Sequence, residues 1–153
     1  MSNSDGNPIY VRQQILFTLK LMVWLLLLAV TSCSDVIKSS YPNFTSAKNN
    51  QAFERGWLPP TLPTSAYNIY EEHNLDRNTG YGTFLFQSKD VQDFRRQLTP
   101  ISTDILIKAI KRYQYNDEVG KLKQQGFDFY VAEKQFYFAI DWSTCKGVFW
   151  LIP

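Results

Sequence analysis

The most constraining feature of this sequence is a run of ten apolar residues near its amino end. Residues 21–30 contain no polar side chain, and Arg12 and Lys20 precede the run. A helix needs about 20 such residues to span the hydrocarbon core of a bilayer. The run is therefore short for a membrane span, and its charged approach and apolar body are typical of a secretory signal. An uncleaved signal anchor is the alternative interpretation.

Two small residues and a cysteine follow the apolar run directly. Val30, Thr31, Ser32 and Cys33 resemble the lipobox of bacterial lipoproteins. That resemblance implies cleavage between Ser32 and Cys33, lipid on the Cys33 sulfur, and usually a fatty acyl chain such as palmitate on the new amino terminus. Two or more acyl chains hold a protein stably on a membrane. We therefore expect an envelope protein that faces the periplasm. Ser34 is not the aspartate that is typical of inner-membrane retention in enteric bacteria, which favours the outer membrane.

The remaining chain divides into a tether and one domain. Residues 33–52 are rich in Ser, Asn and Lys, which predicts a flexible lipidated tether with at most a short helix over residues 47–55. An apolar content of 44% and an aromatic content of 16% exclude wholesale disorder beyond it. We therefore assign residues 1–32 to a signal peptide, 33–52 to the tether and 53–153 to one globular domain.

Sequence periodicity predicts the fold class of that domain. Apolar residues at helical spacing predict helices over residues 90–98 and 101–113. We expect a single α+β domain, in which an antiparallel sheet of about five strands is covered by two helices on one face. Five segments have the β-forming residues or the apolar–polar alternation of strands: 67–75, 81–87, 127–131, 136–142 and 148–152.

The charge balance argues against nucleic acid as a partner. The formal net charge is +2, from 16 basic and 14 acidic side chains. Removal of residues 1–32, which hold Arg12, Lys20 and Asp5, leaves 14 basic and 13 acidic side chains. Nucleic-acid binding needs a concentrated basic face, which this composition lacks. Besides the membrane, reached through Cys33, we expect an envelope protein as the partner.

The cysteine and histidine counts argue against a metal or cofactor. Two cysteines and one histidine do not supply a zinc site at ligand spacing. A disulfide between Cys33 and Cys145 is arithmetically allowed, but lipidation of Cys33 leaves Cys145 alone. Residues 76–80 begin like a calcium loop, yet the glycine and glutamate required at its sixth and twelfth positions are missing. We expect no metal and no cofactor.

His73 is the only histidine and the first candidate for general acid–base chemistry. Strand alternation places Glu71 on the same face as His73, and Asp76 follows shortly after. No nucleophile with a recognisable motif accompanies them, so a polar strand face exposed near a turn is the simpler interpretation. Trp57 and Trp142 are candidates for a ligand or partner surface, although tryptophans in a domain of this size also fill the core.

The domain also shows a broader resemblance, which covers the chain from about Phe53 onward and is carried by Gly56, Trp57, Leu58, Pro59, Pro63, Ser65, Ala66, Ile69, Asp76 and Asn78. The group that it resembles, small uncharacterised bacterial envelope lipoproteins, brings no established activity. We expect a lipid-anchored interaction protein, such as an immunity or inhibitor protein, rather than an enzyme. A small envelope enzyme that uses His73 with a neighbouring carboxylate, and an aromatic-pocket ligand-binding domain, are the alternatives.

Overall fold

The computed structural model describes Phe17 and residues 36–111 and 116–153. The chain divides into two units, residues 1–34 and residues 35–153, and the second carries the fold described below. Except for Phe17, the predicted signal peptide lies outside the described residues, together with the cleavage and lipidation positions Ser32 and Cys33.

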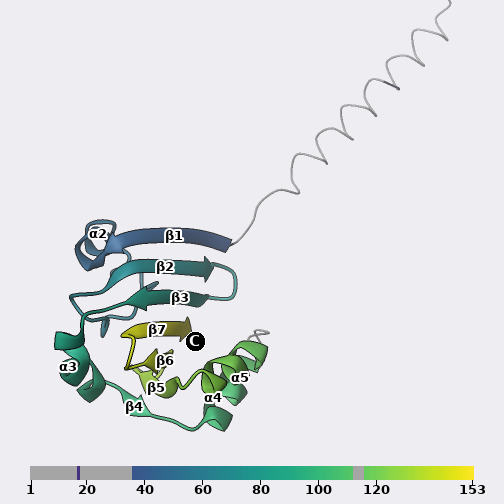
Figure 1. The fold of residues 1–153 in the computed structure, drawn as a ribbon. Helices are drawn as coiled ribbons and strands as arrows, with labels where there is room; N and C mark the ends of the chain where they lie inside the picture. The colour runs from purple at the N-terminus through teal and green to yellow at the C-terminus, as the bar shows by residue number, and fades with distance from the viewer. Residues whose placement is uncertain (1–16, 18–35, 112–115) are drawn as a thin grey trace, which may run out of the picture. The chain divides into compact units, whose positions relative to one another are not determined.

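One antiparallel sheet organises the second unit (Figure 1). Its strand order is β1-β2-β3-β7-β6-β5-β4. The chain therefore forms one half of the sheet with β1 to β3, places β4 at the opposite edge, and fills the middle with β5 to β7. The hairpins β2–β3, β5–β6 and β6–β7 join strands that are neighbours in the sequence. The strands are β1 (Val36–Asn43), β2 (Tyr67–Asn74), β3 (Thr79–Leu85), β4 (Thr99–Pro100), β5 (Asp128–Ala132), β6 (Phe136–Asp141) and β7 (Lys146–Leu151).

Short helices connect the strands, and side chains cap two of them. The Asn43 side chain accepts a hydrogen bond from the Ser46 amide at 2.9 Å, and Ser102 caps its helix by accepting from the Ile105 amide. Such caps satisfy amide groups that a helix leaves unpaired at its start. The helices are α2 (Phe44–Asn49), the 3₁₀ turn η1 (Ser88–Asp90), α3 (Val91–Arg96), α4 (Thr103–Ile110) and α5 (Asn116–Gln124).

Two apolar cores lie on opposite faces of the sheet, because successive side chains of a strand point to opposite faces. In β7, Phe149 and Leu151 belong to one core, whereas Val148 and Trp150 belong to the other. The first core receives Ala47 of α2, Leu58 and Leu62 of the connector after it, and Phe94 of α3. The second receives Leu106 and Ile110 of α4 with Val119 and Leu122 of α5.

This arrangement corrects the predicted architecture in two respects. The sheet has seven strands rather than about five, and helices cover both of its faces rather than one. The strands added to the prediction are the sheet's edges, β1 and β4. Edge strands are difficult to detect in a sequence because they bury few side chains: Tyr41 is the only buried residue of β1, and β4 has only two residues.

The predicted flexible tether is the third correction. Residues 36–43 pair with β2 along its length, from Val36 opposite Asn74 to Asn43 opposite Tyr67. Helix α2 follows at once, and Ala47 and Ala52 are fully buried. Backbone hydrogen bonds to β2, rather than an apolar pattern, order this segment, so its Ser- and Asn-rich composition misled the prediction.

The predicted helix over residues 101–113 also differs in the structure. Helix α4 ends at Ile110, and a separate α5 begins at Asn116; Tyr113 lies outside the described residues. Gly120 lies within α5, although glycine disfavours helices by about 1 kcal/mol relative to alanine. The burial of Val119 and Leu122 supplies the tertiary packing that offsets this cost.

Candidate functional site

The structure brings Glu71 and His73 together on one face of β2, as strand alternation predicted, but it buries them. Glu71 is 0% exposed and His73 is 3% exposed, so the exposed strand face expected for them is wrong. The register places Gly82 opposite Glu71 and Gly80 opposite His73 on β3. These glycines leave room: a Cβ on Gly80 would lie 3.5 Å from His73 Nδ1, and one on Gly82 would lie 2.4 Å from the Phe149 ring.

Trp57 covers His73 from the connector that follows α2. The two rings stack with centroids 5.2 Å apart and an interplanar angle of 26°, and the Arg55 guanidinium lies 4.1 Å from the centre of the Trp57 ring. A neutral imidazole beneath an indole is well accommodated in such a stack. Burial lowers the pKa of His73 accordingly, since desolvation disfavours the charged ring.

Glu71 has no hydrogen-bond partner of normal geometry on either carboxylate oxygen, and His73 Nδ1 has none either. Burial raises the pKa of Glu71, while the hydroxyls of Ser39 and Tyr41 and the charge of Arg55 pull that pKa back. Burial therefore shifts both side chains towards their neutral forms. A catalytic acid or base must reach its substrate directly or through one water, and these two groups are enclosed by protein.

The third predicted partner of this cluster lies elsewhere. Asp76 is exposed in the turn between β2 and β3, whereas Glu71 and His73 face the core. The structure therefore does not bring Asp76 to Glu71 and His73 as a catalytic set. Across the described residues, no group of three or more His, Cys, Asp or Glu side chains is placed to hold a metal ion.

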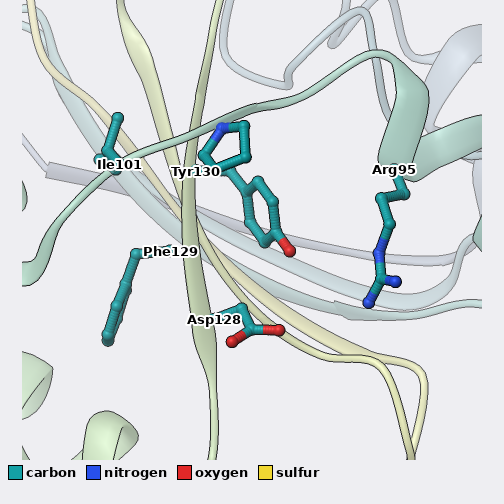
Figure 2. Close-up of a pocket in the computed structure, with 6 residues that line it drawn as sticks. Arg95, Ile101, Asp128, Phe129 and Tyr130 are labelled. Carbon is teal, nitrogen blue, oxygen red and sulfur yellow. The ribbon is translucent and has the colours of Figure 1, made fainter.

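A pocket that the sequence did not reveal lies at the opposite edge of the sheet. It has a volume of about 390 Å³, within the range of small-ligand sites, about 300–1,000 Å³. We call it the edge pocket. Figure 2 shows its polar side chains, a guanidinium, a phenol and a carboxylate that border one space. Its lining comes from α3, from β4 with the residue after it, and from β5: Arg95, Pro100, Ile101, Asp128, Phe129 and Tyr130.

Trp142 holds two of these polar groups in place. The Arg95 guanidinium lies 4.5 Å from the centre of the Trp142 ring, and the Trp142 indole N–H donates a hydrogen bond to the Tyr130 hydroxyl at 3.0 Å. Cation–π contact and hydrogen bonding of this kind restrict both side chains before any ligand arrives. Trp142, predicted as a ligand or partner surface, thus lies behind the edge pocket as a support.

The turn after Trp142 is itself tightly fixed. Asp141 accepts hydrogen bonds from the hydroxyls of Ser143 and Thr144 at 2.6 and 2.5 Å. These bonds lower the pKa of Asp141 to about 2, because they favour the charged carboxylate. Cys145 closes the turn as a free thiol at φ 53°, with its sulfur 3.8 Å from the Trp142 carbonyl. A rigid turn therefore anchors the support of the edge pocket.

The other predicted tryptophan, Trp57, belongs to the His73 stack and not to the edge pocket. Sequence reasoning missed Arg95, Asp128 and Tyr130 because they come from separate elements and form no local motif. One signal was available: Tyr130 lies between the apolar residues Phe129 and Val131 of a predicted strand, and a tyrosine that is buried usually finds a hydrogen-bond partner.

A second hollow of about 310 Å³ lies between α3 and the proline-rich connector, beside Pro63, Asp93 and Phe94. The carboxylates along it are already engaged. Asp90 accepts from the Ser65 amide at 3.3 Å, and Asp93 pairs with Arg96. The edge pocket is therefore the better candidate, because its cation has no such partner.

Within the described part of the chain, no helix has the length and apolarity needed to cross a membrane. Comparison with protein families matches residues 35–85 to the family described as the YbbD head domain. That match spans about a third of the chain, from β1 to β3, and includes Glu71, His73 and Trp57 but not the edge pocket. No curated protein and no solved structure matches the chain. The family match suggests a bacterial envelope-type protein.

Proposed function

We propose that this chain is a lipid-anchored protein of the bacterial cell envelope that binds a partner through the edge pocket. The anchor is the thioether at Cys33 after removal of residues 1–32, and the domain faces the periplasm, with the outer membrane as the favoured site. Two observations support the location: the apolar run that ends in the lipobox-like residues before Cys33, and the family match to residues 35–85.

Because β1 begins soon after Cys33, such an anchor would hold the domain close to the membrane. Only Ser34 and Asp35 separate Cys33 from Val36, where β1 begins. An extended chain spans at most about 3.6 Å per residue, so the lipid attachment would lie within about 11 Å of the sheet. The domain is then held against the membrane surface, and a partner has to meet it there.

The observation that supports the binding function best is that the Arg95 guanidinium forms no ion pair within the described part of the domain. No carboxylate of the described residues lies within 4 Å of its guanidinium, which is nevertheless held against Trp142. An exposed guanidinium that lies against an indole and forms no ion pair with a described carboxylate can pair with an anionic group of a partner. Arginine is also one of the residues enriched among those that contribute most to binding at interfaces.

The enzyme alternative is the weaker one because of burial. His73 and Glu71 are enclosed, and Trp57 stacks on His73. Both side chains face the core, where a substrate does not reach them. A binding protein needs only the edge pocket, and an immunity or inhibitor protein is one form of this function, in which the partner is a toxin or a wall hydrolase.

Site-directed photocrosslinking in the native envelope tests this proposal. A photoreactive amino acid replaces Pro100, which is exposed in the lining of the edge pocket, and in a matched strain it replaces Lys121, exposed on α5. We expect a discrete adduct from position 100 that disappears with Arg95→Gln and is absent from position 121. No adduct at position 100, or the same adducts at both positions, contradicts the proposal.

A further inference from the structure

We propose that the edge pocket recognises the carboxylate of a peptide terminus or an amino acid, with Arg95 and Tyr130 as its two donors. The inference rests on the proposed binding function of the same pocket and names the chemistry of what is bound. It is carried by the geometry around Trp142 and by the charges in the pocket wall.

Arg95 is prepared to bind a planar anion edge-on. Its guanidinium carbon lies 4.5 Å from the centre of the Trp142 ring, and no carboxylate of the described residues forms an ion pair with the group. Its N–H groups lie in one plane and are therefore available to an anion in the edge pocket. Their fork matches the two oxygens of a carboxylate, which is the pairing that arginine makes best.

Tyr130 adds a second donor from another element of the fold. Its hydroxyl oxygen already accepts the Trp142 indole N–H at 3.0 Å, so its own proton is directed to a different acceptor. A phenol offers one donated and up to two accepted hydrogen bonds. The side chain is 7% exposed, and the hydroxyl lies on the side where it meets the edge pocket (Figure 2).

Asp128 decides which anion fits. It is exposed at the start of β5 in the same lining, where its carboxylate adds a negative charge without forming an ion pair with Arg95. A phosphate dianion would meet that negative charge, and like charges at close range cost binding free energy. A carboxylate that carries an ammonium or amide N–H beside it satisfies both Arg95 and Asp128, as an amino acid or peptide terminus does.

The remaining residues of the lining are apolar, but only one of them shares the face of Tyr130. Pro100 pairs with Tyr130 in the sheet and is exposed, and it offers no amide hydrogen that would need a partner. Ile101 and Phe129 border the edge pocket from the strand itself, because their side chains belong to the second core on the opposite face. A volume of about 390 Å³ accommodates a short peptide end rather than a folded loop.

The test is a titration of the full domain, followed by NMR through the indole N–H signal of Trp142. The probes are tri-alanine with a free carboxylate, tri-alanine carboxamide and inorganic phosphate. We expect saturable binding of tri-alanine, with the carboxamide weaker by roughly tenfold or more because the charged hydrogen bonds are lost. Phosphate should bind less tightly than tri-alanine to the natural protein.

Two matched arginine variants assign the effect. Arg95→Gln should weaken tri-alanine roughly tenfold or more, while Arg96→Gln, on the adjacent exposed residue that pairs with Asp93, should leave affinity unchanged. Arg95→Lys should recover only part of the affinity, because lysine lacks the planar fork. Unchanged spectra away from the edge pocket verify that each variant is folded.

Equal binding of the acid and the carboxamide overturns this inference, as does tighter binding of phosphate or the absence of any shift of Trp142. These outcomes are distinct from failure of the proposed function. A crosslink at position 100 that depends on Arg95, combined with no preference for the carboxylate probe, would leave partner binding in place and remove only the ligand class.

Discussion

Glu71→Gln isolates the energetic cost of the buried carboxyl group in the first core. The side chain is 0% exposed, and neither oxygen has a partner of normal hydrogen-bond geometry. Glutamine keeps the shape and one carbonyl acceptor for the nearby hydroxyls of Ser39 and Tyr41, but it removes the ionisable proton. The substitution should therefore change how stability depends on pH more than it changes packing.

The sign follows from the raised pKa of Glu71. Between its ordinary value of 4.5 and its value in the folded domain, the folded state binds more protons than the unfolded chain does. The free energy of unfolding of the natural protein consequently falls as pH rises through this window and then levels off. The loss is about 1.4 kcal/mol for each pH unit of the window, and Glu71→Gln abolishes it.

Urea denaturation followed by tryptophan fluorescence at pH 4, 6 and 8 measures the effect. At pH 4 the two proteins should agree within about 1 kcal/mol, the size of one ordinary hydrogen bond; at pH 8 the glutamine variant should be the more stable. Glu72→Gln is the control, since its carboxylate is partly exposed and pairs with Lys38 at 3.1 Å. It should cost at most about 1 kcal/mol. A stability difference that stays constant from pH 4 to pH 8 would refute the buried, unpartnered state of Glu71.

Three further predictions concern the fold. Gly82→Ala should destabilise the fold by about 1–3 kcal/mol through overpacking, because its Cβ would lie 2.4 Å from the Phe149 ring. Gly120→Ala has open space around it and should stabilise α5 by up to about 1 kcal/mol. The midpoints of thermal unfolding of these two variants should therefore shift in opposite directions. Asn43→Ala should cost about 1 kcal/mol by removing the cap of α2, and an unchanged midpoint in urea would instead favour the flexible tether. His73→Gln should remove a loss of stability on acidification below pH 6.5, since burial lowers the pKa of His73 and charging it favours the unfolded chain.

Sequence periodicity located the elements whose side chains enter a core. The hairpin over β2 and β3 and the three strands β5 to β7 lie close to their predicted positions, because alternation there reflects burial. The same reasoning missed β1, which is held by backbone pairing with β2 and whose side chains are mostly half-buried or exposed. A pattern method detects what a strand buries, whereas an edge strand is specified by what it pairs with.

The candidate site was harder to predict for a related reason. Glu71 and His73 were found because they are two residues apart on one strand, although the covering Trp57 comes from a connector whose path the sequence does not fix. Arg95 and Tyr130 are linked by their separate contacts with Trp142. Three residues brought together by tertiary packing leave no spacing that a single sequence can reveal.

The most direct test of the account is an intact-mass measurement of the protein purified from its own membranes. We expect a chain that begins at Cys33 and carries the mass of two or three acyl chains, and we expect release of the domain from membranes when Cys33→Ser removes the attachment site. A chain that still begins upstream of Ser32, or one that carries no acyl mass, contradicts the account.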